Sequence, residues 1–344
     1  MSNYQALQKQ KKILLAEKKP PRAREAAKQL NISEAEFVAL SCGDSCQQLN
    51  KDSFVEILQS LETVGEVMAL TRNEAMVLES HGIYKDAVSR HGHIIINTDE
   101  IDLRLRVSAW QYGFAVDENG RQSLQFFDEF GEATHKIYLT KKSDIDAYQK
   151  MVARHTNSDG FDDLNIVDKP AQETLETDIA IDSVAFKKDW AELNDAHQVN
   201  GLLNKYNLTR PQAYRHLGDD VFMLRNNGLR EMLEIASEKD IPILMFVPNH
   251  ASTQIHNGTV NKLMEMGPWF NVLDPAFNLH ANMNLISETW CVVKQTDDTA
   301  TYSMEIFDEN QLPLMMVYLH PSAKQDNDMQ ARWANTLKNL KQED

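Results

Sequence analysis

An internal duplication constrains this chain more than any other feature of its sequence. Identical residues recur along the chain at two constant separations. The first separation links Asn73 with Asn249, Gly82 with Gly258, and Leu103 with Leu279. The second, slightly longer, links Trp110 with Trp290, Ser123 with Ser303, Phe127 with Phe307, and Tyr138 with Tyr318. Two constant separations with a short insertion between them predict two copies of one structural unit.

The length of the chain agrees with this duplication. A chain of 344 residues is about twice the length of an ordinary domain. We expect a first repeat over residues 1–157, an acidic linker or crossover over 158–182, and a second repeat over 183–344.

Each repeat combines helical patterns with short β-rich runs. In the first repeat a helix is expected after Pro21-Arg22, another after Ser33 with Glu36 completing its cap, and a third over 51–61. The β-rich runs that follow include GEVMALTR, HIIIN and THKIYLT, and Asn119-Gly120 predicts a hairpin turn. A final helix is expected at 143–154 and at 327–340. The predicted fold class is α+β, a tandem duplication in which each half is a large antiparallel β-sheet flanked by helices.

Charge and cysteine content narrow the classes of partner and location. The net charge of −16 disfavours nucleic acid, and the apolar run 243–247 is far too short to span a membrane. An odd count of three cysteines predicts reduced thiols and a cytoplasmic location. Cys42 and Cys46 are four positions apart and could share a helix face, but two thiols without nearby histidines make a poor zinc site.

The sequence contains no phosphate-binding glycine loop, HExxH, GxSxG or CxxC motif. Two other residues are candidates for binding chemistry. His197 borders the apolar stripe of a helix predicted over 186–206, so it is either a partly buried structural histidine or a ligand for a flat molecule. Arg210 lies between the N-cap candidate Thr209 and Pro211, so it is either part of an anion site or an exposed arginine.

Three stretches carry a resemblance to a known family. They are DAHQVNGLLNKYNLTRPQAYR at 195–215, NTDEIDLRLRVSAW at 97–110 and GRQSLQFFDEFG at 120–131. Together with the duplication, they resemble the HemS/ChuS family of bacterial cytoplasmic haem-utilisation proteins, also called haemin-degrading factors. The resemblance extends over about 21–340. It implies two stacked repeats with one haem b in a cleft between the halves.

The resemblance also implies roles for individual residues. His197 matches the axial ligand of the haem iron, and Arg104 matches the arginine on the distal side. The residues that match the propionate side and the aromatic wall are Arg210, Lys294, Tyr318 and Phe246.

The sequence departs from the family pattern at three positions. Arg106 stands where an aromatic residue is common. His320 stands near the place of a missing propionate arginine and is a candidate to replace it. Leu78 stands where some relatives carry a histidine, with His81 close by, which disfavours a second haem site there.

The implied function is to bind imported haem and degrade it with an external reductant, with His197 and Arg104 as catalytic residues. A haem carrier that delivers its cargo to a separate oxygenase is the alternative. A third possibility is a duplicated scaffold for another planar anion or a protein partner. The implied partners are an inner-membrane haem transporter and an electron donor. We expect a monomer or dimer, with no nucleic acid bound and no membrane insertion.

Overall fold

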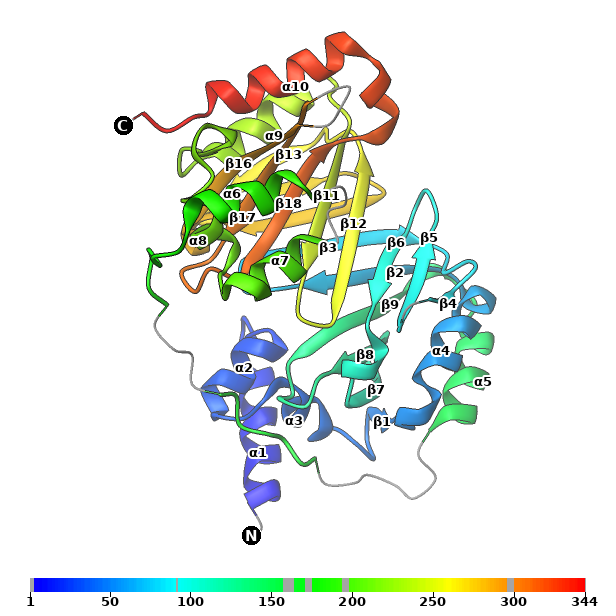
Figure 1. Cartoon of the computed structure of the whole chain (residues 1–344). Helices are drawn as coiled ribbons and strands as arrows, with labels where there is room; N and C mark the ends of the chain where they lie inside the picture. Colours follow the sequence, from blue (N-terminus) through cyan, green and yellow to red (C-terminus); the bar gives the residue numbers. More distant parts are fainter. Residues whose placement is uncertain are drawn as a thin grey trace. The chain divides into compact units, whose positions relative to one another are not determined.

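A computed structural model describes residues 3–90, 92–156, 164–170, 175–193, 198–295 and 300–343. It contains both helices and strands, as expected for an α+β protein (Figure 1). The helices are α1 (Asn3–Leu15), α2 (Ala23–Leu30), α3 (Glu34–Ala39), α4 (Phe54–Ser60), α5 (Ile145–His155), α6 (Ser183–Ala191), α7 (Gln198–Tyr206), α8 (Arg210–Tyr214), α9 (Gly228–Glu238) and α10 (Asn327–Asn339). Within these described residues, no helix is long and apolar enough to cross a membrane.

The first repeat contributes strands β1 (Cys46–Gln48), β2 (Gly65–Arg72), β3 (Met76–Gly82), β4 (Val88–Arg90), β5 (His93–Asn97), β6 (Asp102–Leu105), β7 (Tyr112–Glu118), β8 (Arg121–Phe127) and β9 (Ala133–Ser143). The second contributes β10 (Val221–Met223), β11 (Ile243–Pro248), β12 (Ser252–Gly258), β13 (Leu263–Met266), β14 (Trp269–Leu273), β15 (Phe277–Asn282), β16 (Glu288–Gln295), β17 (Ala300–Phe307) and β18 (Pro313–Leu319).

The strands form two antiparallel sheets of nine strands each. Their orders are β1-β7-β8-β9-β2-β3-β15-β14-β13 and β10-β16-β17-β18-β11-β12-β6-β5-β4. When each strand of one repeat is matched with its counterpart in the other, the two orders are the same. Helices flank the sheets: α3 contacts β7, α8 contacts β16 and α10 contacts β17. The predicted duplication and fold class are therefore confirmed.

Two compact units divide the chain. Unit 1 comprises Met1–Arg72, Val77–Pro170 and Pro248–Ile255, and unit 2 comprises Asn73–Met76, Ala171–Val247 and His256–Asp344. Each unit therefore contains a short segment that belongs to the other sequence repeat.

Asn73 and Asn249, the first matched pair of the duplication, form the same turn in both repeats. The Asn73 side-chain oxygen accepts hydrogen bonds from the amides of Ala75 (3.2 Å) and Met76 (2.9 Å). The Asn249 oxygen accepts bonds from Ala251 (3.0 Å) and Ser252 (2.8 Å). A side chain that binds the backbone two and three residues ahead imitates a backbone turn. The repeated asparagine therefore repeats a local hydrogen-bond pattern.

Helix starts and the hairpin turn also follow the sequence. Ser33 and Thr209, which have the same separation as Asn73 and Asn249, each cap a short helix by a complete capping box. Asn119 and Gly120 both adopt positive φ, at 57° and 85°, between β7 and β8. Two consecutive positive φ values are what a two-residue type I′ hairpin turn requires.

The prediction of one continuous helix over 186–206 is wrong. Helix α6 ends at Ala191, where Glu192 caps it, and α7 begins at Gln198. Leu193 lies between them outside any helix. An apolar stripe fixes which side of each segment is buried, but it does not show whether the backbone bends between two segments that bury the same side.

The core of unit 1 encloses a neutral histidine. Trp110 and Phe126 stack with ring centroids 4.6 Å apart, and His135 lies 6.1 Å from the Trp110 ring. The His135 Nδ1 atom lies 2.9 Å from the Thr71 hydroxyl oxygen, and its Nε2 atom lies 2.7 Å from the Tyr84 hydroxyl oxygen. Burial lowers the pKa of His135 to about 3. Both hydrogen-bond partners are neutral hydroxyls, so they do not offset the cost of burying a charged imidazolium.

The burial of His135 predicts that the folded state loses stability in mild acid. In the unfolded chain the imidazole has a pKa of about 6.5, so between that pH and about 3 the unfolded state binds a proton that the native state excludes. We expect the free energy of unfolding to fall by up to about 1.4 kcal/mol per pH unit on this account as the pH drops through that window. Urea titrations at pH 7, 6 and 5 measure the slope.

The control variants separate His135 from the other histidines. His135→Gln should be less stable at pH 7 and should show a shallower pH slope than the wild type. His81→Gln, a partly exposed histidine on β3, should keep the wild-type slope. An unchanged slope in the His135 variant would contradict the assignment.

Candidate functional site

The aromatic candidates of unit 2 lie together on one face of its sheet. Tyr318 on β18 pairs with Leu244 on β11, and Phe246 is two residues further along β11. Residues two apart on a strand share a face. The rings of Phe246 and Tyr318 are in contact, with centroids 5.7 Å apart and planes at 83°. We call the side of β16, β17, β18 and β11 that carries Tyr318 the Tyr318 face.

Lys294 belongs to the same face. Tyr318 pairs with Ser303 on β17, and Ser303 pairs with Val292 on β16. Lys294 follows Val292 by two residues, so its side chain is on the same side of the sheet. On this face Leu244, Phe246, Met316 and Tyr318 are half-buried, whereas Met245, Val247 and Val317 on the opposite side are buried. The Tyr318 face therefore offers an aromatic surface on β18 and β11 with an ammonium group on β16, two strands from β18.

A buried carboxylate holds Arg210 over this face. The Arg210 guanidinium donates to Glu305 on β17 at 3.0 Å and lies 3.4 Å from the Tyr214 hydroxyl oxygen. The Tyr214 hydroxyl donates to the same Glu305 oxygen at 2.5 Å. Glu305 is only 3% exposed, and it is two residues from Ser303 on the Tyr318 face. The interpretation of Arg210 as an exposed arginine is wrong.

The charges of this cluster are fixed by its surroundings. Burial alone would lower the pKa of Arg210, but Glu305 and Tyr214 raise it above its usual value. Burial raises the pKa of Tyr318, with Glu305 adding to the effect. The face therefore presents a permanent cation and a neutral phenol, both hydrogen-bond donors suited to a carboxylate.

Helix amides contribute less to the expected anion site. Helix α8 has only five residues, and the Thr209 side chain accepts the bond from the Gln212 amide. The anion-binding capacity of this segment therefore rests on the Arg210 guanidinium.

His197 lies outside the described residues. Helix α7 begins directly after it, and Val199, Leu202 and Leu203 of α7 belong to one buried cluster with Trp290 and Val292 of β16. Trp290, Val292 and Lys294 alternate along β16 on the Tyr318 face. The helix that follows His197 is thus packed on this face.

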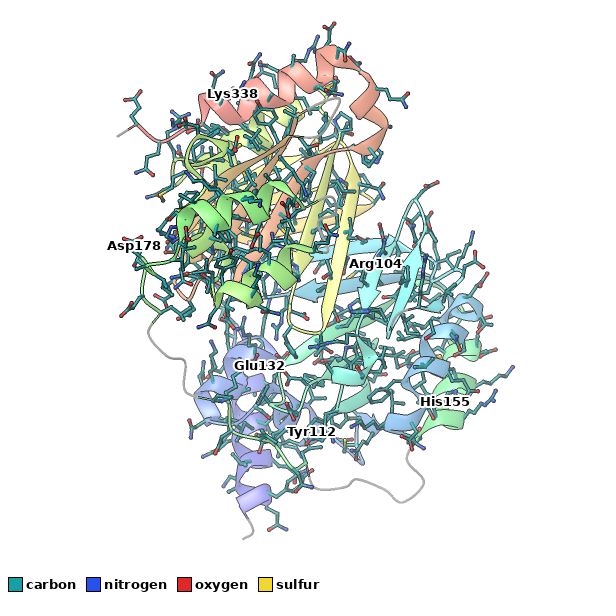
Figure 2. The ribbon with its side chains drawn as sticks, in the orientation of Figure 1. Arg104, Tyr112, Glu132, His155, Asp178 and Lys338 are labelled. Atoms are coloured by element: carbon teal, nitrogen blue, oxygen red, sulfur yellow. The ribbon has the colours of Figure 1, made fainter. Side chains whose placement is uncertain are left out.

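Arg104 belongs to unit 1, whereas the other described candidates belong to unit 2. It lies on β6 and is labelled in Figure 2. Its guanidinium forms an ion pair with Asp102 and donates to the Leu103 carbonyl at 3.0 Å. Burial raises the pKa of Asp102, and Arg104 opposes that shift. About a third of the Arg104 side chain remains exposed.

The three residues that depart from the family pattern pack or form hydrogen bonds within the fold. Arg106 donates to the His250 carbonyl at 2.7 Å. His320 caps a short 3-10 turn, with its Nδ1 atom 2.7 Å from the Ser322 hydroxyl oxygen. Leu78 is fully buried.

Three residues that hold the candidates in place were not predicted from the sequence: Glu305, Tyr214 and Asp102. The duplication contained one usable signal, because the repeat counterpart of Glu305 is Gln125, another buried polar residue on a strand. The Glu305 ion pair forms only when distant elements meet. Asp102 and Tyr214 lie two and four residues from the arginines that they contact, but sequence proximity alone does not indicate these contacts.

Comparisons with known proteins identify the family of this chain. Residues 31–155 and 207–340 match the family model of the haemin-degrading HemS.ChuX domain. Among curated proteins, the hemin transport protein HmuS of Yersinia pestis is 34% identical over 308 residues, covering 86% of each chain. The hemin transport protein HemS of Yersinia enterocolitica is 32% identical over 331 residues, covering 94% of this chain and 93% of the relative.

Two solved structures share the fold over the full length. Holo-PhuS, a haem-binding protein from Pseudomonas aeruginosa, has 33% identity and a TM-score of 0.91, with 98% of this chain and 99% of PhuS covered. The haem-degrading enzyme ChuS from Escherichia coli O157:H7 has 29% identity and a TM-score of 0.89, with 99% and 100% covered. Since the family model matches both repeats and the relatives span nearly the whole chain, this protein belongs to the haemin-degrading HemS/ChuX family.

Proposed function

We propose that this protein binds haem with His197 as the axial ligand of the iron and degrades it with an external reductant. Arg210, Lys294 and Tyr318 bind the propionates, Phe246 contacts the macrocycle, and Arg104 acts on the distal side. The observation that carries the proposal is the buried Arg210–Glu305–Tyr214 network, which fixes a cation beside the aromatic pair of the Tyr318 face.

The chemistry of these residues suits the ligand. Haem has a flat apolar ring, two carboxylates and an iron that accepts a neutral imidazole. When bound, it supplies the iron at which oxygen and electrons react. The protein supplies binding, orientation and charge. Arg104 contributes a cationic guanidinium with several hydrogen-bond donors, which stabilises negative charge where it develops.

The names of the relatives support both degradation and delivery. ChuS is named a haem-degrading enzyme and a haem oxygenase, whereas the two Yersinia relatives are named hemin transport proteins. A carrier that passes haem to a separate oxygenase is therefore the second candidate. An inner-membrane haem transporter, an electron donor and a cytoplasmic location belong to the same proposal.

Substitution of His197 and Arg104 separates binding from turnover. His197→Ala should lose the ligated Soret band, because the iron loses its imidazole. Arg104→Ala should bind haem within about fivefold of the wild type, a difference of ~1 kcal/mol, yet lose most turnover. Haemin titration and the decay of the Soret band under reductant and oxygen measure the two effects. His81→Ala and Arg106→Ala are the matched controls, and wild-type behaviour in both test variants would reject these roles.

Catalase distinguishes an enzyme from a carrier. The purified protein is given stoichiometric haemin, ascorbate and oxygen, with and without catalase. We expect a linear tetrapyrrole product that forms in both cases. Bleaching that catalase abolishes would indicate free peroxide chemistry and favour delivery.

Glu305 should act as a positioning residue for Arg210. Glu305→Gln removes the charge that holds the guanidinium and should weaken haem binding about tenfold, or ~1.4 kcal/mol, without moving the Soret maximum. Arg210→Ala should weaken binding similarly, and the double variant should be less than additive because both act through one interaction. The exposed Glu309→Gln is the control. Fully additive losses would show that the two residues act independently.

A further inference from the structure

A tight loop in unit 1 brings two cysteines together. Helix α3 ends at Ala39, so Cys42 and Cys46 do not share a helix face, contrary to the expectation from their spacing. The amides of Asp44 and Ser45 both donate to the Ser41 carbonyl at 3.1 Å. Gly43 adopts φ +87° and its amide donates to the Cys46 carbonyl at 3.2 Å. The backbone turn is therefore closed by its own hydrogen bonds.

The two sulfur atoms are 2.9 Å apart, and both cysteines are free thiols. A disulfide bond is about 2.05 Å long, so the sulfurs need to approach by less than about 1 Å. The loop already holds most of the geometry that a disulfide requires, and little chain entropy remains to be lost on closing it.

Lys11 of α1 lies beside this pair. Its ammonium group donates to the Ser41 hydroxyl and to the Phe37 carbonyl, both at 2.6 Å. The hydrogen bond from Cys46 lowers the pKa of Cys42, opposed by burial and helped by the Lys11 charge. The same bond, together with burial, raises the pKa of Cys46. The two thiols thus differ, with Cys42 the readier to ionise.

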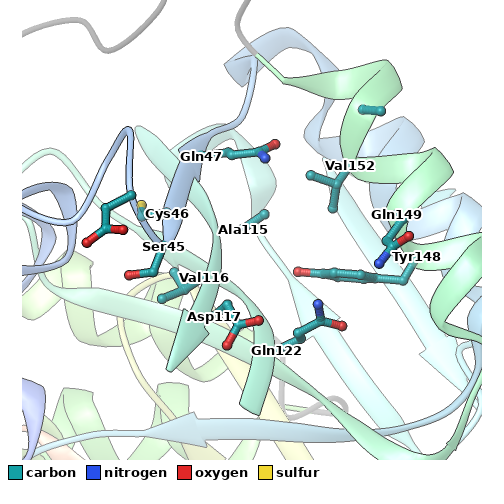
Figure 3. Close-up of a pocket in the computed structure, with 12 residues that line it drawn as sticks. Ser45, Cys46, Gln47, Ala115, Val116, Asp117, Gln122, Tyr148, Gln149 and Val152 are labelled. Atoms are coloured by element: carbon teal, nitrogen blue, oxygen red, sulfur yellow. The ribbon is translucent and has the colours of Figure 1, made fainter. Parts of the chain in front are cut away.

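The loop borders two cavities, and one of its two cysteines is partly exposed. Cys42 is half-buried. Cys46 lines a cavity of about 330 Å³ between β1, β7 and α5. Tyr148 and Val152 of α5 line the same cavity (Figure 3). Ser41 and Asp44 also border a separate cavity of about 870 Å³. Cys291, by contrast, is fully buried, and burial raises its pKa to about 12.

We propose that Cys42 and Cys46 form a reversible disulfide when a hydroperoxide oxidises Cys42. The Cys42 thiolate attacks one peroxide oxygen, so that an S–O bond forms, the O–O bond breaks and the leaving oxygen departs as water (or an alcohol) after taking a proton. The Cys46 sulfur then attacks the Cys42 sulfur. The S–S bond forms, the S–O bond breaks, and water leaves with the Cys46 thiol proton. Two thiols are oxidised and one peroxide is reduced.

Mass spectrometry of the full-length chain without added haem tests the proposal. Both cysteines fall in the tryptic peptide 29–51, while Cys291 falls in 263–294. After stoichiometric hydrogen peroxide and alkylation, peptide 29–51 should lose about 2 Da and take up no alkyl group, and a dithiol reductant should reverse this. Cys291 should stay reduced. An unoxidised pair, a cross-link between chains or a cross-link to Cys291 would overturn the proposal.

Cysteine variants test the order of the two steps. Cys46→Ser should accumulate a Cys42 sulfenic acid that dimedone traps. Cys42→Ser should give no dimedone adduct at Cys46. Trapping at Cys46 instead would reverse the roles.

Lys11→Met should slow the peroxide reaction at pH 7 several-fold, because the charge that favours the Cys42 thiolate is lost. The neighbouring exposed Lys12→Met is its control. Circular dichroism shows whether the Lys11 variant keeps its fold. If that variant is unfolded, the comparison of Cys42→Ser and Cys46→Ser still decides the proposal.

Discussion

A buried ion pair between the start of a short helix and the face of a sheet organises each unit. In unit 2, Arg210 at the start of α8 pairs with Glu305 of β17. In unit 1, Glu34 at the start of α3 pairs with Lys136 of β9 at 2.6 Å and also with Arg72 of β2. Unpaired, any of these buried charges would destabilise the fold by several kcal/mol, so each helix start is tied to its sheet.

Both repeats contain such an ion pair, but the helix residue is acidic in the first repeat and basic in the second. Glu34 and Arg210 occupy equivalent positions in the duplication, each directly after the residue that caps its helix. The repeat that begins its helix with a carboxylate has its cations on the strands. The repeat that begins its helix with a guanidinium presents that cation beside Phe246 and Tyr318. Two copies of one scaffold therefore have different surfaces for anions, although their strands follow the same order.

Local structure was largely predictable from the sequence, because local hydrogen bonds and alternation decide it. The run GEVMALTR is strand β2 residue for residue, Ser33 and Glu36 form the predicted cap, Thr209 caps α8, and Asn119-Gly120 makes the hairpin turn. The break between α6 and α7 was not predictable, since both segments bury the same side. Nor were the partners of the site residues: Glu305 is 95 residues from Arg210, and only tertiary packing brings the two together.

The division of the chain into units has a consequence for any attempt to separate the halves. Residues Pro248–Ile255 come from the second repeat but belong to unit 1, where Thr253 pairs with Arg104 across β12 and β6. A fragment that stops at the end of the first repeat would leave β6 with an open edge of unpaired amides and carbonyls, a surface on which chains aggregate. Each unit of the duplicated chain therefore includes a segment from the other repeat. Truncation at the linker would remove β12 and expose the edge of β6 with which it pairs.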